Sequence, residues 1–111
     1  MSTYNFPNHL KDDTFQGVTF TVLVNSVPLD LTDSSIRMGL RGAGGSLEKT
    51  FVVGSGITLT MPASGIFTFN KQIIDLPAQT YTYDIQFTLN TGEVYTYISG
   101  EWMIVQDVTN V

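Results

Sequence analysis

Apolar residues recur at every second position over most of this chain, from about Phe15 onward. The alternation is clear in residues 18–24 and again in residues 81–89. Successive side chains of a β-strand point to opposite faces, so this period predicts strands with one buried face. Such a face must pack against a second layer, because a single amphipathic sheet leaves its apolar side in water. The sequence therefore predicts an all-β fold.

Short clusters of Gly, Pro, Asn and Ser separate the alternating segments. Strands are expected near residues 18–24, 36–40, 47–53, 57–61, 66–70, 80–89, 94–98 and 102–108. A short extended piece is expected at 29–31. Residues 71–76 form a crossing segment whose secondary structure the pattern does not decide. A helix over 36–40 is the weaker reading, because Gly39 disfavours it. Residues 42–45, Gly-Ala-Gly-Gly, predict a hairpin loop. Turns at this spacing favour an antiparallel Ig-like β-sandwich of about 7–9 strands.

Composition narrows the classes of protein that fit. A chain of 111 residues supports one core, and its net charge of −5 disfavours binding to a phosphate backbone. The absence of cysteine excludes disulfides and thiolate metal sites. No apolar run approaches a membrane span, and the first residues lack the pattern of a signal peptide. We therefore expect synthesis in the cytoplasm, with neither nucleic acid nor a membrane as partner and with no cofactor.

The first 14 residues lack the alternation that follows them. They contain Pro7, Asn8 and three charged residues, Lys11, Asp12 and Asp13. Segments of this kind at a chain terminus are commonly mobile until a partner orders them. We expect a flexible N-terminal arm at 1–14 that docks on a neighbouring subunit, followed by a β-sandwich domain at 15–111.

Four of the five tyrosines fall in residues 81–97, around a turn at 90–92. Tyr81 and Tyr83 lie on the apolar side of their strand, which predicts that both pack in the core. The positions of Tyr95 and Tyr97 depend on the register of the hairpin, because a shift of one residue reverses every side chain of a strand.

Two registers are open at this point. A two-residue loop at 91–92 places Ile85 opposite Ile98 and turns the tyrosines of the second strand outward. A three-residue loop at 90–92 with a bulge at its last residue turns the same tyrosines into the core. We favour the first register, because it pairs aliphatic residues across the hairpin.

An exposed aromatic ladder of this kind usually marks an interface. The candidate interface residues are Tyr95, Tyr97 and Trp102 of the hairpin region, with Tyr4 and Phe6 of the N-terminal arm. Protein contact is the favoured use of the ladder, and stacking on a carbohydrate is the alternative.

No pattern of residues indicates catalysis. The single histidine, His9, lies in the expected arm, far from the framework that a Ser-His-acid mechanism needs. Glu48, Glu93 and Glu101 offer carboxylates for a glycosidase, but their spacing selects no pair. Asp30 and Asp33 are the nearest approach to a calcium cluster, and a capped turn explains them equally well. We expect a protein that is not an enzyme and holds no metal.

Three stretches carry a resemblance to a known family: LDLTDSSIRMGLR, GITLTMPASGIFTF and LPAQTYTYDIQFTLNTGEVYTYISGEWMIVQDVT. Together they resemble small Ig-like domains of tailed bacteriophage virions, found in tail, baseplate, fibre-adaptor or head-decoration proteins. The resemblance spans residues 15–110. Two turn positions depart from it, because Asp33 and Gln79 stand where the family usually has glycine.

The resemblance implies a non-enzymatic structural or attachment module that assembles as a homo-oligomer with other virion proteins. It implies location in the virion after synthesis in the host cytoplasm, and a glycan of the host surface is a further expected partner. It implies no catalytic residues. The alternative function is a carbohydrate-binding β-sandwich module that stacks sugars on Tyr95, Tyr97 or Trp102.

Overall fold

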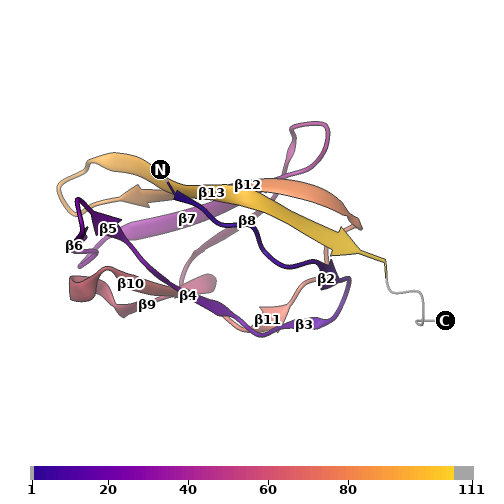
Figure 1. Ribbon diagram of the computed structural model, residues 1–111, viewed down its shortest axis with the longest axis horizontal. Coiled ribbons are helices and arrows are strands. Elements are labelled where there is room, and N and C mark those ends of the chain that lie inside the picture. The colour runs from indigo at the N-terminus through magenta and orange to yellow at the C-terminus, as the bar shows by residue number, and fades with distance from the viewer. Residues whose placement is uncertain (1, 107–111) are drawn as a thin grey trace.

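The computed structural model describes residues 2–106 and is an all-β sandwich 49 Å long and 26 by 23 Å across (Figure 1). Its strands are β1 (Ser2–Thr3), β2 (His9–Leu10), β3 (Thr14–Phe15), β4 (Val18–Thr21), β5 (Leu23–Val24), β6 (Val27–Pro28), β7 (Ser35–Arg41), β8 (Leu47–Val53), β9 (Gly56–Met61), β10 (Ile66–Phe69), β11 (Gln72–Ile73), β12 (Gln79–Thr88) and β13 (Val94–Val105). One 3-10 turn, η1 (Pro62–Ser64), joins β9 to β10. The predicted fold class is confirmed.

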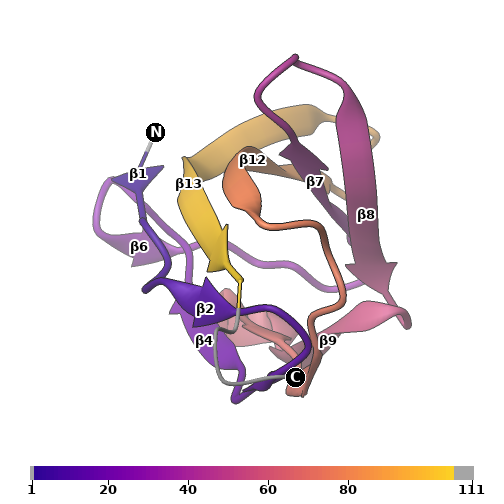
Figure 2. The same ribbon diagram turned by 90° about the vertical axis from the view of Figure 1, so that its right-hand side faces the viewer.

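The main strands follow one continuous path that folds into two layers. Hydrogen bonding runs in the order β1-β13-β12-β7-β8-β9-β10-β4, and β2 also pairs with β13. Figure 2 shows β8 descending on one side to β9 in the second layer, with the N-terminal segment and β4 on the opposite side. Most pairings are antiparallel, whereas β8 with β9, and β1 and β2 with β13, are parallel. The pairing of β8 with β9 therefore joins the two layers on one side of the sandwich. The N-terminal segment lies on the opposite side.

Alternation of side chains along the strands builds the core between the layers. On β12, Tyr81, Tyr83, Ile85 and Phe87 are all buried, while the residues between them are exposed. The opposite layer contributes Phe67 and Phe69 of β10, both fully buried. Large aromatic rings dominate this interior, which is the usual source of stability in a sandwich. The prediction that Tyr81 and Tyr83 are core residues is confirmed.

The N-terminal segment is part of the sandwich, so the structure corrects the expected flexible arm at 1–14. β1 and β2 pair in parallel with β13, at Ser2–Ile98 and His9–Ile104. Between them Phe6 is only 5% exposed and belongs to the core. The prediction failed because these residues lie along the edge of another strand, and single core side chains in a short irregular segment produce no period.

The C-terminal strand also differs from the prediction. We expected separate strands at 94–98 and 102–108, with a bend at Gly100, but β13 runs without a break from Val94 to Val105. Gly100 lies inside it because the N-terminal segment crosses at this point: a Cβ on Gly100 would overlap the carbonyl oxygen of Tyr4. The last residues of the expected strand, 107 and 108, fall outside the described residues.

Candidate functional site

An apolar groove of about 310 Å³ opens between β13 and the chain at β4 and β5. We call it the open-edge groove, and its lining residues are Tyr4, Phe20, Thr21, Val22, Leu23, Val24, Tyr97 and Ile98. None of these residues carries a charge. The groove lies on the side of the sandwich where the two layers are joined by the N-terminal segment and not by a shared pair of long strands. Its position is therefore a direct result of the strand order.

The N-terminal segment fills the same gap farther along the molecule. The Tyr4 ring packs edge-on against Phe20 of β4, with centroids 5.4 Å apart, and Phe6 continues the line inward. Pairing of this segment with β13 starts at Ser2, opposite Ile98. Beside residues 94–97 of β13 the described part of the chain places no further strand. The open-edge groove is thus the part of the gap that described residues leave unfilled.

A tight hairpin shapes the outer rim of the groove. β5 and β6 are joined by Asn25 and Ser26, which both have positive φ, at 53° and 66°. This is the turn geometry that matches the twist of two-residue hairpins. It leaves Leu23 55% exposed and Val27 62% exposed. Sequence reasoning missed Leu23, although an apolar residue on the polar side of an alternating strand was an available signal.

The β12–β13 hairpin combines the two registers that the sequence left open. Near the turn the three-residue loop is observed: the Leu89 amide donates to the Glu93 carbonyl oxygen at 2.8 Å, and Gly92 has φ of +92°. Farther along, Ile85 lies opposite Ile98, as the favoured two-residue loop required. A bulge between these regions reconciles them, because Gln86 pairs with Thr96 and Tyr97 is the extra residue.

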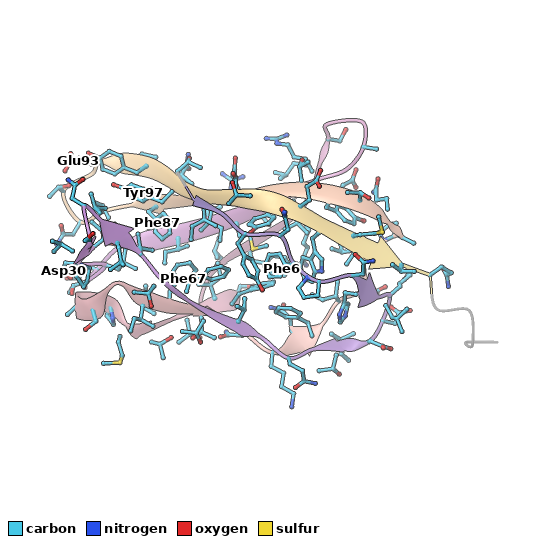
Figure 3. The ribbon with its side chains drawn as sticks, in the orientation of Figure 1. Phe6, Asp30, Phe67, Phe87, Glu93 and Tyr97 are labelled. Atoms are coloured by element: carbon cyan, nitrogen blue, oxygen red, sulfur yellow. The ribbon has the colours of Figure 1, made fainter. Side chains whose placement is uncertain are left out.

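The bulge decides where the two candidate tyrosines lie. Tyr95 is opposite Phe87, on the core side of the sheet, but it sits at the end of the sandwich and remains 38% exposed. Tyr97 is half-buried, with its ring 5.7 Å from Phe87 and stacked on Tyr95 at 5.4 Å between centroids. Figure 3 shows Tyr97 above Phe87 near the hairpin end of the molecule, with Glu93 at the tip. The expected outward ladder is therefore a stacked pair at one end of the groove.

Glu93 is held as a charged acceptor beside this pair. Its carboxylate accepts hydrogen bonds from the Tyr95 hydroxyl at 2.6 Å and from the Thr91 hydroxyl at 2.9 Å. Both bonds, the Tyr95 bond first, lower the pKa of Glu93. The bond to Glu93 is also the largest cause that raises the pKa of Tyr95. A hydrogen-bonded carboxylate next to an exposed ring can accept further hydroxyl donors.

Two of the predicted interface residues are inside the protein. Trp102 is fully buried and Phe6 is 5% exposed, so neither reaches a partner. Both face inward because β13 is one continuous strand and the N-terminal segment packs against it. Tyr4 and Tyr97 line the open-edge groove, and Tyr95 stands beside it. Of the five candidates, these three remain accessible, and their role in an interface stays a prediction.

Glu93 and Glu101, two of the carboxylates weighed for catalysis, lie far apart. His9 Nε2 is 2.9 Å from the Asp13 carbonyl oxygen, which can only accept, so this nitrogen carries the proton. Glu93 and Glu101 are eight residues apart along an extended strand, roughly 25 Å, whereas paired glycosidase carboxylates lie within about 10 Å. Within residues 2–106, no group of three or more His, Asp or Glu side chains could hold a metal ion.

The Asp30 turn is a capped corner. The Asp30 carboxylate accepts from the Thr32 hydroxyl at 2.6 Å and from the Thr32 amide at 2.9 Å. Both bonds lower the pKa of Asp30, the hydroxyl bond more. The carboxylate thus satisfies local donors, as the alternative to a calcium site required.

Comparison with known proteins supports the architecture and little beyond it. No protein-family model matches the chain, and no curated protein matches it in sequence. Among solved structures, CopC from Methylosinus trichosporium OB3b superposes with a TM-score of 0.50 and 12% identity, over 89% of this chain and 84% of CopC. At that identity the likeness shows the fold alone. The part of the chain that the structure describes contains no helix long and apolar enough to cross a membrane.

Proposed function

We propose that this chain is a non-enzymatic structural module of a bacteriophage virion, and that it contacts another virion protein through the open-edge groove. The resemblance of residues 15–110 to small virion domains supports this role. The evidence for the position of the contact is the open-edge groove, an uncharged, aromatic-lined hollow of about 310 Å³ between two strands. Concave apolar surfaces of this kind are where partners of low charge bind.

The groove suits an extended segment of a partner chain. Residues 94–97 of β13 have no strand paired along their outer edge in the described structure, so their backbone groups can pair with an incoming strand. β1 already adds to β13 in this manner immediately beyond, in parallel register. A partner strand would therefore continue a pairing that the fold uses for its own N-terminus.

This mode of contact replaces the docking arm. The apolar side chains of the N-terminal segment, Phe6 above all, pack into the sandwich of the same chain. The segment is therefore not available to wrap around a neighbouring subunit. The assembly role then depends on the groove and on the outer faces of the sheets.

Incorporation into particles tests the proposal. Phage particles from a host carrying the gene are purified on a density gradient, and their peptides are identified by mass spectrometry. We expect peptides of this chain at a constant ratio to the other virion proteins. Their absence from purified particles would overturn the virion role.

A matched pair of substitutions tests the groove. Leu23→Glu places a charge in the groove, whereas Val27→Glu places the same charge on the same hairpin outside it. Both sites are exposed, so both variants should fold. We expect Leu23→Glu to be lost from particles and Val27→Glu to be retained. Equal retention of the two would exclude the groove as the contact.

A second candidate function is binding of a neutral carbohydrate at the hairpin end. The supporting observation is Tyr95, whose partly exposed ring stands beside the Glu93 carboxylate. Ring faces stack on sugars while a carboxylate accepts hydroxyl protons. A glycan array probed with wild type and with Tyr95→Ala tests it: saturable binding that the variant loses favours this function, and silence of both proteins excludes it.

A further inference from the structure

The sheet face opposite the core carries an ordered polar pattern on β7 and β12. Gly39 lies directly across from Asp84, with Arg37 one step away along β7 on one side and Arg41 on the other. Arg37, Arg41 and Asp84 are all exposed, and their neighbours on the same strands point into the core. We call this surface the outer face of β7 and β12.

A hollow lies at the centre of this face. It measures about 160 Å³, and its lining residues are Arg37, Gly39, Arg41, Leu47, Asp84 and Gln86. It exists because Gly39 has no side chain: a Cβ there would stand 3.2 Å from the Leu47 Cδ1 atom. The backbone does not require glycine at this position, since φ of Gly39 is not positive. The backbone conformation therefore does not explain the glycine, and its main effect is to leave this space empty.

The two arginines beside the hollow carry positive charge that a partner's carboxylate could bind. They are the only arginines of a chain whose net charge is −5. Within residues 2–106 the ion pairs closer than 4.0 Å all involve Lys11, so neither guanidinium is paired with Asp84 or any other carboxylate. Arg41 donates one hydrogen bond, to the Gly45 carbonyl oxygen at 3.1 Å. A carboxylate entering the hollow would meet a guanidinium on either side.

We propose that this face pairs with the same face of a second copy of the chain, so that Asp84 of each copy enters the Gly39 hollow of the other. A two-fold axis in the plane of the contact, parallel to the strands and midway between β7 and β12, exchanges these strands. It brings Gly39 onto Asp84 of the second copy, with Arg37 and Arg41 flanking that carboxylate. The contact is isologous, because each copy supplies both the hollow and the acid.

Charge selects this arrangement over the other in-plane axis. A two-fold axis perpendicular to the strands would place Arg37 of one copy on Arg41 of the other, and like charges in contact are unfavourable. The chosen axis brings opposite charges together twice, and charge-assisted hydrogen bonds from arginine are strong and directional.

The geometry of stacked sheets fits the same contact. Facing sheets lie about 10 Å apart and cross at about 30°, so register is best kept at the centre of the face. The Gly39–Asp84 pair is adjacent to the axis, where the mismatch is least. The axis also brings β8, with exposed Leu47 and Val52, over β13 of the second copy and adds apolar area.

This pairing rests on the proposed function, for which it names the homo-oligomeric contact, and sedimentation of three proteins tests it. Wild type should sediment at twice the mass of one chain. Asp84→Arg alone, and Arg37→Glu with Arg41→Glu, should each weaken self-association by about 30-fold or more, because each confronts like charges. All three sites are exposed, so the variants should melt as wild type does.

Mixing the two charge variants makes the test decisive. In the mixed pair every acid again faces a base, so an equimolar mixture should form the dimer that neither variant forms alone. Lys71→Glu is the control, since it reverses an exposed base outside the face and should leave the dimer intact. A monomeric wild type, dimeric charge variants, or a mixture that stays monomeric would each overturn the pairing. None of these results bears on whether the chain is incorporated into particles, so the two proposals can fail separately.

Discussion

Phe6 stacks on Trp102, with ring centroids 4.5 Å apart and ring planes 25° from parallel. The first ring belongs to the irregular segment between β1 and β2, and the second to β13. Both are buried, and Phe6 also contacts Phe15, Phe20, Phe69 and Tyr83. The N-terminal segment is therefore anchored through one aromatic side chain that joins both layers.

Removal of that anchor should cost much of the stability. We expect Phe6→Ala to lower the free energy of unfolding by about 3–5 kcal/mol, the usual range for a buried phenylalanine. Denaturant unfolding followed by the fluorescence of Trp102 measures the change. Tyr95→Ala, at a partly exposed ring, is the control and should cost less than half as much. A loss below about 1 kcal/mol for Phe6→Ala would mean that the segment is not part of the core.

A methyl group at Gly100 should displace the N-terminal segment. The added Cβ would collide with the Tyr4 carbonyl oxygen, which also accepts a hydrogen bond from the Tyr83 hydroxyl. We expect Gly100→Ala to destabilise the fold by about 1–3 kcal/mol, as overpacking does. It should also speed hydrogen exchange at the amides of Tyr4 and Phe6, which bond to β13. Gly44→Ala is the control, because nothing lies within 4 Å of a Cβ there; equal effects of the two would contradict the crossing.

The β5–β6 turn offers a stabilising substitution. Ser26 has φ of +66°, a left-handed conformation that costs a residue with a side chain roughly 1–2 kcal/mol. Ser26→Gly should therefore raise the free energy of unfolding, by about 1 kcal/mol, and the melting temperature with it. Ser26→Ala should bring no gain. Thermal melts of the three proteins measure the order, and a destabilised Ser26→Gly would mean that the turn has another geometry.

The ion pair between Lys11 and Asp75 predicts a pH dependence. Lys11 Nζ lies 2.9 Å from Asp75 Oδ1, and this bond lowers the pKa of Asp75 from an ordinary value near 3.8. It also raises the pKa of Lys11 above 10.5. A lowered acid pKa stabilises the fold above 3.8 and loses that effect as the pH falls through the lowered value. A raised lysine pKa stabilises it below 10.5 and loses the effect as the pH rises through the raised value.

Comparison with Asp75→Asn isolates this effect. Wild type should melt higher than the variant between these limits, and the difference should shrink toward zero on both sides. It should also shrink in high salt, because Asp75 is largely exposed and Lys11 partly exposed. A difference that is constant from pH 2 to 7 would show that the ion pair does not contribute.

Strands β7 and β12 could be predicted from sequence because each has one face in the core and one in solvent. Arg37, Gly39 and Arg41 alternate with buried residues, so the position of β7 and its faces follow from the pattern alone. The glycine-rich loop after β7 could also be predicted, because glycine favours the tight turns of a hairpin. Local alternation is enough wherever pairing is antiparallel and the turns are short.

The candidate site could be predicted only in part, because long-range pairing positions it. The parallel contact of β1 with β13 joins residues at opposite ends of the sequence and has no local signal. The bulge at Tyr97 mixes two registers that the sequence could only offer as alternatives. The outer face of β7 and β12 was not found either, since exposed arginines on an alternating strand look like any solvated surface.

Parallel addition of residues 2–10 to β13 also sets the order in which a newly made chain can mature. The first strands are synthesised with nothing to pair with, since their partner β13 is the last of the described strands to be made. Until then the rings of Phe6 and Phe20 remain exposed to water, and the nascent polypeptide carries an incomplete sheet with exposed apolar surface. Completion of this domain consequently has to wait for β13, and conditions that slow this step should favour aggregation of the nascent chains over assembly.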